Sequence, residues 1–333
     1  MKRFALLFCF ALMGFVASAQ MMPDSTVQVV ASWNPGDKQA YNLSKTDFKV
    51  SDKDTTDLNY STEIMILEVL SKTDTTYQLG LTYKDVYFSD PDMNFLYELM
   101  TKTSGDMTAL ITTDQYGVFK SVDNIQELIS YQMSVVDPYL EILKRQDGAN
   151  LDAATEARIR EYIVQTFAEP KVIESSIHDD FGRMMFFHGV RMELGKQYTA
   201  EIQKPSILPG IDTPITTQMT VWIDTEKTDD ISMHGCIYVP ITKDRLMDFL
   251  VEYMKKVMSL AGMSSEAIDA EIANSTGVIE QMGLSSEEIT DVGVHFATGW
   301  PLYVSNSRYG YSTVNGVNTT KQTHMEIEII LPE

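Results

Sequence analysis

The segments Thr62-Glu-Ile-Met-Ile-Leu-Glu-Val-Leu70 and Tyr77-Gln-Leu-Gly-Leu-Thr-Tyr-Lys84 decide the fold of this chain. In the second segment, apolar and aromatic residues stand at every second position from Tyr77 to Tyr83, with small or polar residues between them. A period of two indicates a β-strand with one buried and one solvated face. The residues that separate the two segments are polar, as is typical of a turn. Together the segments predict a β-hairpin.

Two further hairpins are predicted by the same pattern. One comprises residues 217–223 and 231–239, and the other spans residues 106–122. In the latter, the turn Thr113-Asp-Gln-Tyr-Gly117 ends on a glycine, which can adopt a positive φ. We therefore expect two β-rich sections, one in each half of the chain.

The two β-rich sections share an order of parts. Gly36-Asp-Lys-Gln-Ala-Tyr41 resembles Gly195-Lys-Gln-Tyr198, and Lys72-Thr-Asp74 matches Lys227-Thr-Asp229 between the strands of each hairpin. This shared order predicts an internal duplication. The alternative is that two antiparallel sections use the same common turn chemistry.

Helices are predicted where apolar residues recur at three- and four-residue steps, which places them on one face of a helix. Ser285-Ser-Glu-Glu288 fits the sequence of a capping box and predicts the start of another short helix. The pairs Asp229/Asp230 and Glu287/Glu288 are interpreted as solvated turns or helix starts. The amphipathic stretches are residues 124–143, 152–168, 170–181 and 242–260.

The predicted fold class is α+β: antiparallel and β-rich, with two related β-sheet sections and amphipathic helices inserted after and between them. Residues 1–19 are assigned to a signal peptide and residues 20–35, in which we found no periodicity, to a disordered lead-in. Residues 36–188 form the first β-rich repeat with its helical segment. Residues 189–333 form the second β-rich repeat with its helical insert.

The signal peptide is predicted from a basic start, an apolar run and a small-x-small cleavage site, Ala17-Ser-Ala19. The apolar run of about 13 residues is shorter than the roughly 20 that a membrane-spanning helix needs. Cys9 lies inside this run, not just after it, so we do not expect a lipoprotein. The mature chain is expected in the periplasm or outside the cell, without a transmembrane segment.

Charge and cysteine content exclude several classes of partner and site. The net charge is −21, and removal of residues 1–19 would make it −23, because Lys2 and Arg3 leave and no acid does. Such a chain repels nucleic acids and anionic lipid surfaces. Beyond residue 19 only Cys236 remains, so neither an internal disulfide nor a cysteine-based zinc site is expected. Cys236 is interpreted as a small core residue, with a reactive nucleophile as the alternative.

No catalytic, cofactor-binding or metal-ligating residue is assigned from the sequence, and no cofactor is expected. His-Glu-x-x-His, Gly-x-Ser-x-Gly, phosphate-binding and EF-hand patterns are all missing from the sequence. His178-Asp-Asp180 is the densest group of possible ligands. It is interpreted as a solvated helix end, with a metal site as the alternative. The five histidines are His178, His188, His234, His295 and His324.

Methionine is abundant, with 20 residues. Several stand on predicted helix stripes, among them Met133, Met247, Met254 and Met258. Flexible, polarizable methionines suit surfaces that accept varied apolar ligands, although they also fill gaps in ordinary cores. Helices beside a twisted antiparallel sheet are typical of periplasmic carriers that enclose an apolar cavity.

Several turn motifs resemble those of a family of uncharacterised secreted bacterial proteins, common in Bacteroidetes and classified as a domain of unknown function. They are Gly-Asp-Lys-x-x-Tyr at 36–41, Val190-Arg-Met-Glu-Leu-Gly-Lys-Gln-Tyr198 and His295-Phe-Ala-Thr-Gly-Trp-Pro-Leu302. Where that family usually has a Gly-Asp-x-Trp turn, this chain has Gly195-Lys-Gln-Tyr198. The resemblance implies a β-rich fold and envelope localisation, and it implies no catalytic residue.

Three hypotheses follow. The first is a non-enzymatic secreted or periplasmic protein that binds an apolar or lipid-like ligand, which predicts a cavity lined by methionine and aromatic residues. The second is a periplasmic hydrolase, which predicts that His178, His188 or His295 converges with acids and a hydroxyl group. The third is a structural or protein-interaction module of the envelope, which predicts an exposed apolar patch or sheet edge.

Overall fold

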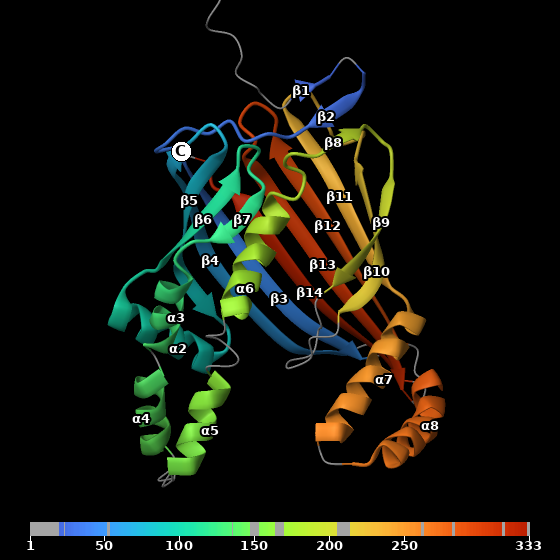
Figure 1. The fold of residues 1–333 in the computed structure, drawn as a ribbon. Helices are drawn as coiled ribbons and strands as arrows, with labels where there is room; N and C mark the ends of the chain where they lie inside the picture. Colours follow the sequence, from blue (N-terminus) through green and yellow to red (C-terminus); the bar gives the residue numbers. More distant parts are fainter. Residues whose placement is uncertain are drawn as a thin grey trace, which may run out of the picture.

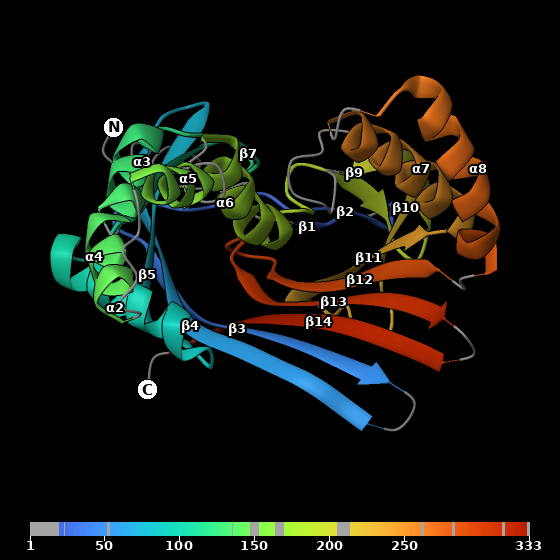
Figure 2. The same cartoon turned by 90° about the horizontal axis from the view of Figure 1, so that it is seen from below.

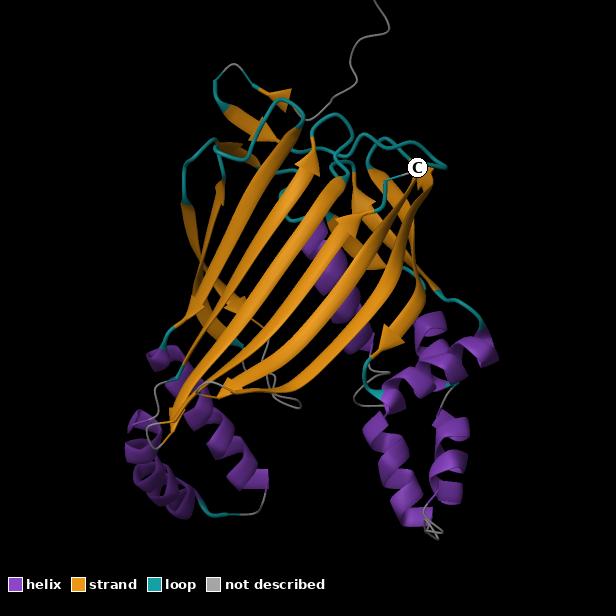
Figure 3. Ribbon diagram, turned by 180° about the vertical axis from the view of Figure 1, so that it is seen from behind, coloured by secondary structure: helices purple, strands orange, loops and turns teal. Residues whose placement is uncertain are grey.

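The computed structural model describes residues 20–22, 24–51, 54–134, 136–146, 153–163, 170–204, 214–260, 263–281, 284–314 and 317–331. One large antiparallel β-sheet curves around a set of helices (Figure 1). Seen from below, the strands form an arc with the helices on its concave side (Figure 2). Among the described residues, no helix covers the convex face (Figure 3). The antiparallel, β-rich fold class is confirmed. The segment predicted to be a signal peptide, residues 1–19, lies outside the described residues.

The main sheet contains eleven strands in the order β7-β6-β5-β4-β3-β14-β13-β12-β11-β10-β9. A second, three-stranded sheet consists of β1 (Gln20–Met21), β2 (Thr26–Gln28) and β8 (Arg191–Glu193). The strands of the main sheet are β3 (Lys38–Ser51), β4 (Asp54–Lys72), β5 (Thr76–Phe88), β6 (Thr108–Asp114), β7 (Phe119–Val122), β9 (Tyr198–Lys204), β10 (Ile215–Ile223), β11 (Ser232–Ile241), β12 (Ser285–His295), β13 (Pro301–Val314) and β14 (Val317–Ile329).

The helices fall into two groups, one in each half of the chain (Figure 1). The four amphipathic stretches predicted as helices are helical where the structure describes them, although residues 147–152 and 164–169 lie outside it. None of the described helices combines the length and the apolar composition that crossing a membrane requires. The first group is α2 (Pro91–Ser104), α3 (Ile125–Met133), α4 (Val136–Gln146), α5 (Ala153–Ile163) and α6 (Pro170–Met184), and the second is α7 (Lys243–Leu260) and α8 (Ser265–Gln281).

The hairpin of β4 and β5 forms as the alternating pattern predicts. Met65 stands opposite Tyr83 and Leu67 opposite Leu81. Met65, Leu67 and Leu81 are at most 1% exposed, because their side chains point to the concave face that the helices cover. The predicted hairpins at residues 106–122 and 217–239 are confirmed as β6–β7 and β10–β11.

The prediction of a disordered lead-in at residues 20–35 is wrong. Val27, Val29, Ala31 and Trp33 alternate with less buried residues, and Trp33 is fully buried. Trp33 stacks on Trp300 with ring centroids 4.5 Å apart. Gln28, Val30 and Ser32 stand between these buried residues, which is the period of two typical of a strand, and the prediction overlooked this short run. Its order comes from contacts with distant parts of the chain.

A glycine in the β6–β7 turn makes room for this lead-in. Gly117 has a φ of 95°, and a Cβ there would lie 2.9 Å from Cδ2 of His188 and 3.1 Å from the Trp33 ring. The turn therefore requires glycine both for its backbone conformation and for the close approach of these rings.

The two β-rich sections join into one sheet, because β3 from the first section pairs with β14 from the end of the second. Each section is a meander with helices between its third and fourth strands: α2 lies between β5 and β6, and α7 and α8 lie between β11 and β12. The two hairpins thus hold equivalent places. Shared topology does not establish a duplication, since antiparallel meanders recur in unrelated folds.

The helix start predicted at Ser285-Ser-Glu-Glu288 is also wrong. These residues open β12, where Glu288 pairs with Val239 of β11 and Arg308 of β13. The capping-box pattern is local, whereas a strand with neighbours on both sides is decided by pairing that local sequence does not reveal. Glu288 is consequently a buried acid, 8% exposed, and not a solvated one.

Candidate functional site

Two hollows lie along α6, one on each side of Asp180. The inner cavity, of about 380 Å³, lies between α2, α3 and α6 and the concave face of β3 to β6. The outer groove, of about 510 Å³, lies between α6 and β13 and β14. Lys45, Ser176 and Asp180 line both. The inner cavity is the candidate binding site.

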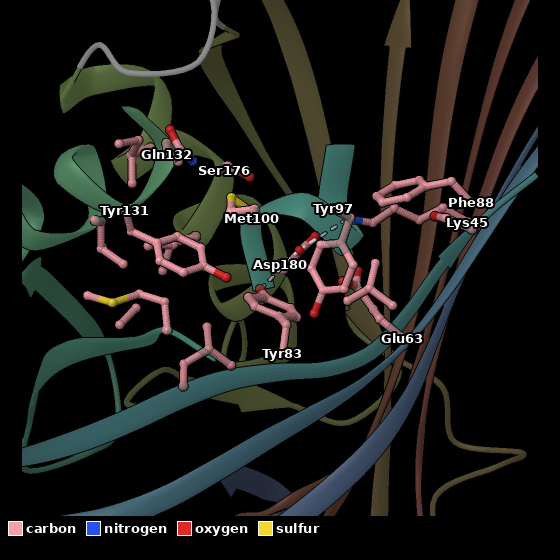
Figure 4. A pocket seen from close by; sticks show the side chains of 18 residues that line it. Lys45, Glu63, Tyr83, Phe88, Tyr97, Met100, Tyr131, Gln132, Ser176 and Asp180 are labelled. Atoms are coloured by element: carbon pink, nitrogen blue, oxygen red, sulfur yellow. Dashed lines mark hydrogen bonds and ion pairs between the residues drawn. The ribbon is translucent and has the colours of Figure 1, made fainter. Parts of the chain in front are cut away.

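The lining of the inner cavity is mainly apolar and aromatic (Figure 4). Its apolar part comprises Leu81, Val86, Phe88, Met100, Met107, Ala109, Leu128, Ile173 and Ile177, and three phenols are added by Tyr83, Tyr97 and Tyr131. Its remaining residues are Lys45, Ser61, Glu63, Gln132, Ser176 and Asp180. Few polar groups in an apolar hollow are typical of sites for small molecules.

Strand alternation places the charged residues of the sheet in this cavity. On β4, Leu67 and Met65 face the concave side, and Glu63 continues the same row. On β3, Leu43 is followed two residues later by Lys45. The apolar faces of both strands therefore become charged at the same end of the sheet.

A bulge interrupts the regular pairing of β4 and β5 beside Glu63. The pairing of β4 with β5 shifts between Thr62, opposite Tyr87, and Ile64, opposite Lys84. Asp85, in the bulged segment, has a φ of 50°, which is uncommon for a residue with a side chain. Bulges and strained residues gather at functional sites, where they redirect side chains. Val86 of the same segment lines the cavity.

Asp180 is a buried carboxylate with partners on two strands. Lys45 Nζ lies 3.1 Å from its Oδ2, and the Tyr83 hydroxyl donates to the same oxygen at 3.3 Å. Burial and the charges of Asp180 and Glu63 raise the pKa of Tyr83 well above its usual value. Tyr83 is therefore a neutral hydrogen-bond donor that holds Asp180 in place.

Glu63 is a cavity carboxylate without such partners. Among the described residues it makes no hydrogen bond and no ion pair within 4 Å. Burial raises its pKa to about 7, with the charge of Lys45 acting against the shift and that of Asp180 adding to it. Glu63 can therefore change its protonation state near pH 7, and its carboxylate can accept a hydrogen bond from a ligand.

The helices contribute further polar atoms to the cavity. Burial and the neighbouring Tyr131 and acids raise the pKa of Tyr97 to about 12. The side-chain oxygen of Gln132 is buried and has no partner among the described groups. Figure 4 shows the rings of Tyr83, Tyr97 and Tyr131 around the space beside Glu63 and Asp180. The cavity therefore offers unsatisfied acceptors next to aromatic rings.

Glu288, near the outer groove, has the opposite surroundings. It accepts hydrogen bonds from Lys204 and from Asn306 Nδ2 at 2.8 Å, and Arg308 Nε lies 3.2 Å away. Burial alone would raise its pKa, but the charges of Lys204, Arg308 and Arg183 outweigh burial and hold it at about 2. Its hydrogen bonds and ion pairs come from within the protein, so it serves the fold.

The histidines named in the hydrolase hypothesis do not meet acids and a hydroxyl group. His178 contacts the Phe119 ring edge-on, and His188 bonds to the Gly299 carbonyl at 2.8 Å. Burial lowers the pKa of His188 to about 4, so it is neutral. His295 contacts the Thr298 hydroxyl at 2.9 Å. In the described part of the chain, no three His, Cys, Asp or Glu residues gather in a way that could hold a metal ion.

A different histidine has triad-like neighbours that were not predicted. His324 Nδ1 lies 2.8 Å from the Ser307 hydroxyl, and its Nε2 lies 3.1 Å from Glu326. These residues are on paired strands, facing away from the buried Met325 and Ile327. The Glu326 side chain is 61% exposed. This row therefore lies on the convex face, away from both hollows.

Cys236 is buried, as predicted. Its thiol donates to Asp291 Oδ1 at 2.9 Å, and burial together with the charge of Asp291 raises its pKa to about 12. A thiol with so high a pKa is a poor nucleophile near neutral pH.

No protein-family model matches the chain, and no curated protein does. A solved structure of lipovitellin with lipid is similar over 90% of this chain, at 10% identity and a TM-score of 0.39; the chain spans 25% of that protein's length. The Ail protein of Yersinia pestis matches over its full length and over 89% of this chain, at 5% identity and a TM-score of 0.17. A mutant of the Rh. blastica porin matches over its full length and over 88% of this chain, at 6% identity and a TM-score of 0.24. Similarity of this degree identifies neither a family nor a ligand.

Proposed function

We propose that this is a non-enzymatic, exported protein of the cell envelope that binds an apolar or lipid-like molecule in the inner cavity. The observation that carries the proposal is the hollow of about 380 Å³ lined by methionine, aromatic and aliphatic side chains. Its volume falls within the roughly 300–1,000 Å³ of small-molecule sites. An apolar ligand that packs against this lining removes apolar surface from water, which favours binding.

Export to the envelope is supported by the N-terminal sequence, with its basic start, apolar run and Ala17-Ser-Ala19. The proposed duplication is supported by the helices that follow the third strand of each section. Neither bears on which ligand is bound, so the cavity is the part to test.

The test is mass spectrometry of small molecules retained by the protein after purification without detergent. We expect an apolar or amphiphilic molecule with the wild-type protein. Ala109 lines the cavity and is 4% exposed, so Ala109→Phe fills part of the hollow and should abolish retention. Ser305→Phe adds the same ring on the convex face and should leave retention unchanged. The proposal is contradicted if both variants retain the same amount of the molecule, or if the wild-type protein retains no apolar or amphiphilic molecule.

A hydrolase is the second candidate, favoured only by the Ser307–His324–Glu326 row. The backbone of β13 pairs with β12 and β14 on either side of Ser307, so its N–H groups are engaged in the sheet and do not form an oxyanion hole. A fluorophosphonate probe should therefore leave Ser307 unlabelled. Labelling that disappears in Ser307→Ala would establish the hydrolase instead.

A further inference from the structure

We infer that the inner cavity selects an amphiphile with a positively charged ammonium headgroup, which Glu63 pairs with while the apolar remainder packs on the methionine and aliphatic lining. This inference rests on the proposed binding function and specifies its ligand class. It depends on the charge balance of the cavity and on the arrangement of its aromatic rings.

The cavity lining carries more negative than positive charge. Its charged residues are Lys45, Glu63 and Asp180. Lys45 already pairs with Asp180 at 3.1 Å, and Tyr83 donates to the same carboxylate. Glu63 is left as the carboxylate without a hydrogen-bonded or ion-paired partner among the described residues. A buried charge is stabilised by an opposite charge, so a cationic headgroup completes the site.

Aromatic rings surround the place where this headgroup would sit. Tyr83, Phe88, Tyr97 and Tyr131 all line the cavity, and Figure 4 shows three of the rings beside Glu63 and Asp180. The faces of aromatic rings attract cations, and cages of such rings recognise quaternary ammonium groups. Rings and one free carboxylate together favour an ammonium over a neutral headgroup.

A fatty acid fits the same cavity less well. Its carboxylate would meet Glu63, and the nearest cation, Lys45, is already held by Asp180. Binding would require a proton on Glu63 or the loss of the Lys45–Asp180 pair. The net charge of −21 also attracts cations to the protein and repels anions.

The inferred pairing makes binding depend on pH. The groups that face Glu63 are Lys45 on β3, Asp180 on α6, Tyr83 on β5, Tyr97 on α2 and Tyr131 on α3. Burial raises the pKa of all three phenols, so they stay neutral between pH 6 and 8. The pKa of Glu63 is about 7 in the empty cavity, so affinity for a cation should rise from pH 6 to pH 8 as its proton leaves.

The experiment is calorimetric titration of the full chain with dodecyltrimethylammonium, dodecanoate and dodecanol, each below its micelle concentration, at pH 6 and 8. At pH 8 we expect the ammonium compound to bind about tenfold more tightly than dodecanoate, the effect of about one pKa unit of interaction. Glu63→Gln should weaken ammonium binding about tenfold and remove its pH dependence.

Glu68→Gln is the matched control. Glu68 stands on the same strand, but it points to the solvated face and pairs with Lys38. This variant should bind all three compounds as the wild type does. The headgroup inference is wrong if the wild type binds dodecanoate more tightly than the ammonium compound. It is also wrong if the affinity of the wild type for the ammonium compound is the same at pH 6 and pH 8. Either result is compatible with the proposed function. If none of the three compounds binds, both fall.

Discussion

Glu63 and Glu288 are acids on the concave face of one sheet, and their surroundings shift their pKa values in opposite directions. Glu288 accepts hydrogen bonds from Lys204 and Asn306 and lies beside Arg183 and Arg308, which keeps its pKa at about 2. Glu63 has no such partner in the described part of the chain, and its pKa is about 7. Burial acts on both carboxylates, so the difference between their pKa values comes from the cationic and hydrogen-bonding partners that surround Glu288.

This difference separates a residue of the fold from a residue of a site. A carboxylate surrounded by cations is satisfied before any ligand arrives, and its removal leaves those cations uncompensated. A carboxylate left without partners destabilises the folded state in its charged form, and a ligand can recover that free energy. The comparison can be tested through the free energy of unfolding.

The largest effect is expected for Glu288→Gln. Loss of this charge leaves Lys204 and Arg308 without their main partner, and breaking a buried pair costs about 3–5 kcal/mol. Urea unfolding at pH 7 measures the loss. Glu287→Gln is the control, because among the described residues the Glu287 carboxylate bonds to the hydroxyls of Tyr238 and Tyr311 alone, and we expect about 1 kcal/mol there. Equal effects at both positions would contradict the role given to Glu288.

The pH dependence of Glu288 has a definite sign. Its pKa falls from 4.5 in the unfolded chain to about 2 in the folded one, so the folded state binds protons less readily. Its stabilisation is complete above pH 4.5 and is lost as the pH falls toward 2. Glu288→Gln should flatten the stability of the protein over this window, as urea unfolding at several pH values would show.

A smaller effect of opposite sign is expected for Glu63→Gln. The pKa of Glu63 rises from 4.5 to about 7 on folding, so its contribution is favourable below pH 4.5 and is lost as the pH rises through 7. Removing the charge should therefore stabilise the protein by about 3 kcal/mol at pH 8 and leave it unchanged at pH 4. Destabilisation at pH 8 would show that Glu63 has a partner.

The smallest effect is expected for an exposed ion pair. Lys38 and Glu68 lie 3.3 Å apart, with side chains 55% and 44% exposed. Solvent screens such pairs, so Lys38→Met should change the free energy of unfolding by less than about 0.5 kcal/mol. A change as large as that of Glu288→Gln would mean that burial does not set the scale of these interactions.

The alternating pattern in the sequence is enough to predict the β4–β5 hairpin and the side chains that the sheet contributes to the site. Alternation from Tyr77 to Tyr83 gave the right face, and the same rule places Glu63 in line with the buried Met65 and Leu67. An acid on the apolar face of a strand was the available signal, and it was missed. Asp180 was interpreted as part of a solvated helix end, because nothing local shows that Lys45, distant in sequence, meets it.

The errors have a common physical cause. At Ser285 the local pattern favoured a helix, and at Trp33 the alternating run is short. In both places partners far along the chain decide the structure. The cavity itself could not be predicted, because its lining residues come from four strands and three helices spread between Lys45 and Asp180.

The pairing of β3 with β14 has a consequence for how the chain folds. Tyr41 stands opposite Ile329, so the centre of the sheet closes only when nearly the whole chain is present. Until then β3 is an unpaired edge, and such edges invite association with other chains. Contacts this distant in sequence also slow folding. We therefore expect slow, chaperone-sensitive folding, and truncation before β14 should yield aggregates instead of a stable fragment.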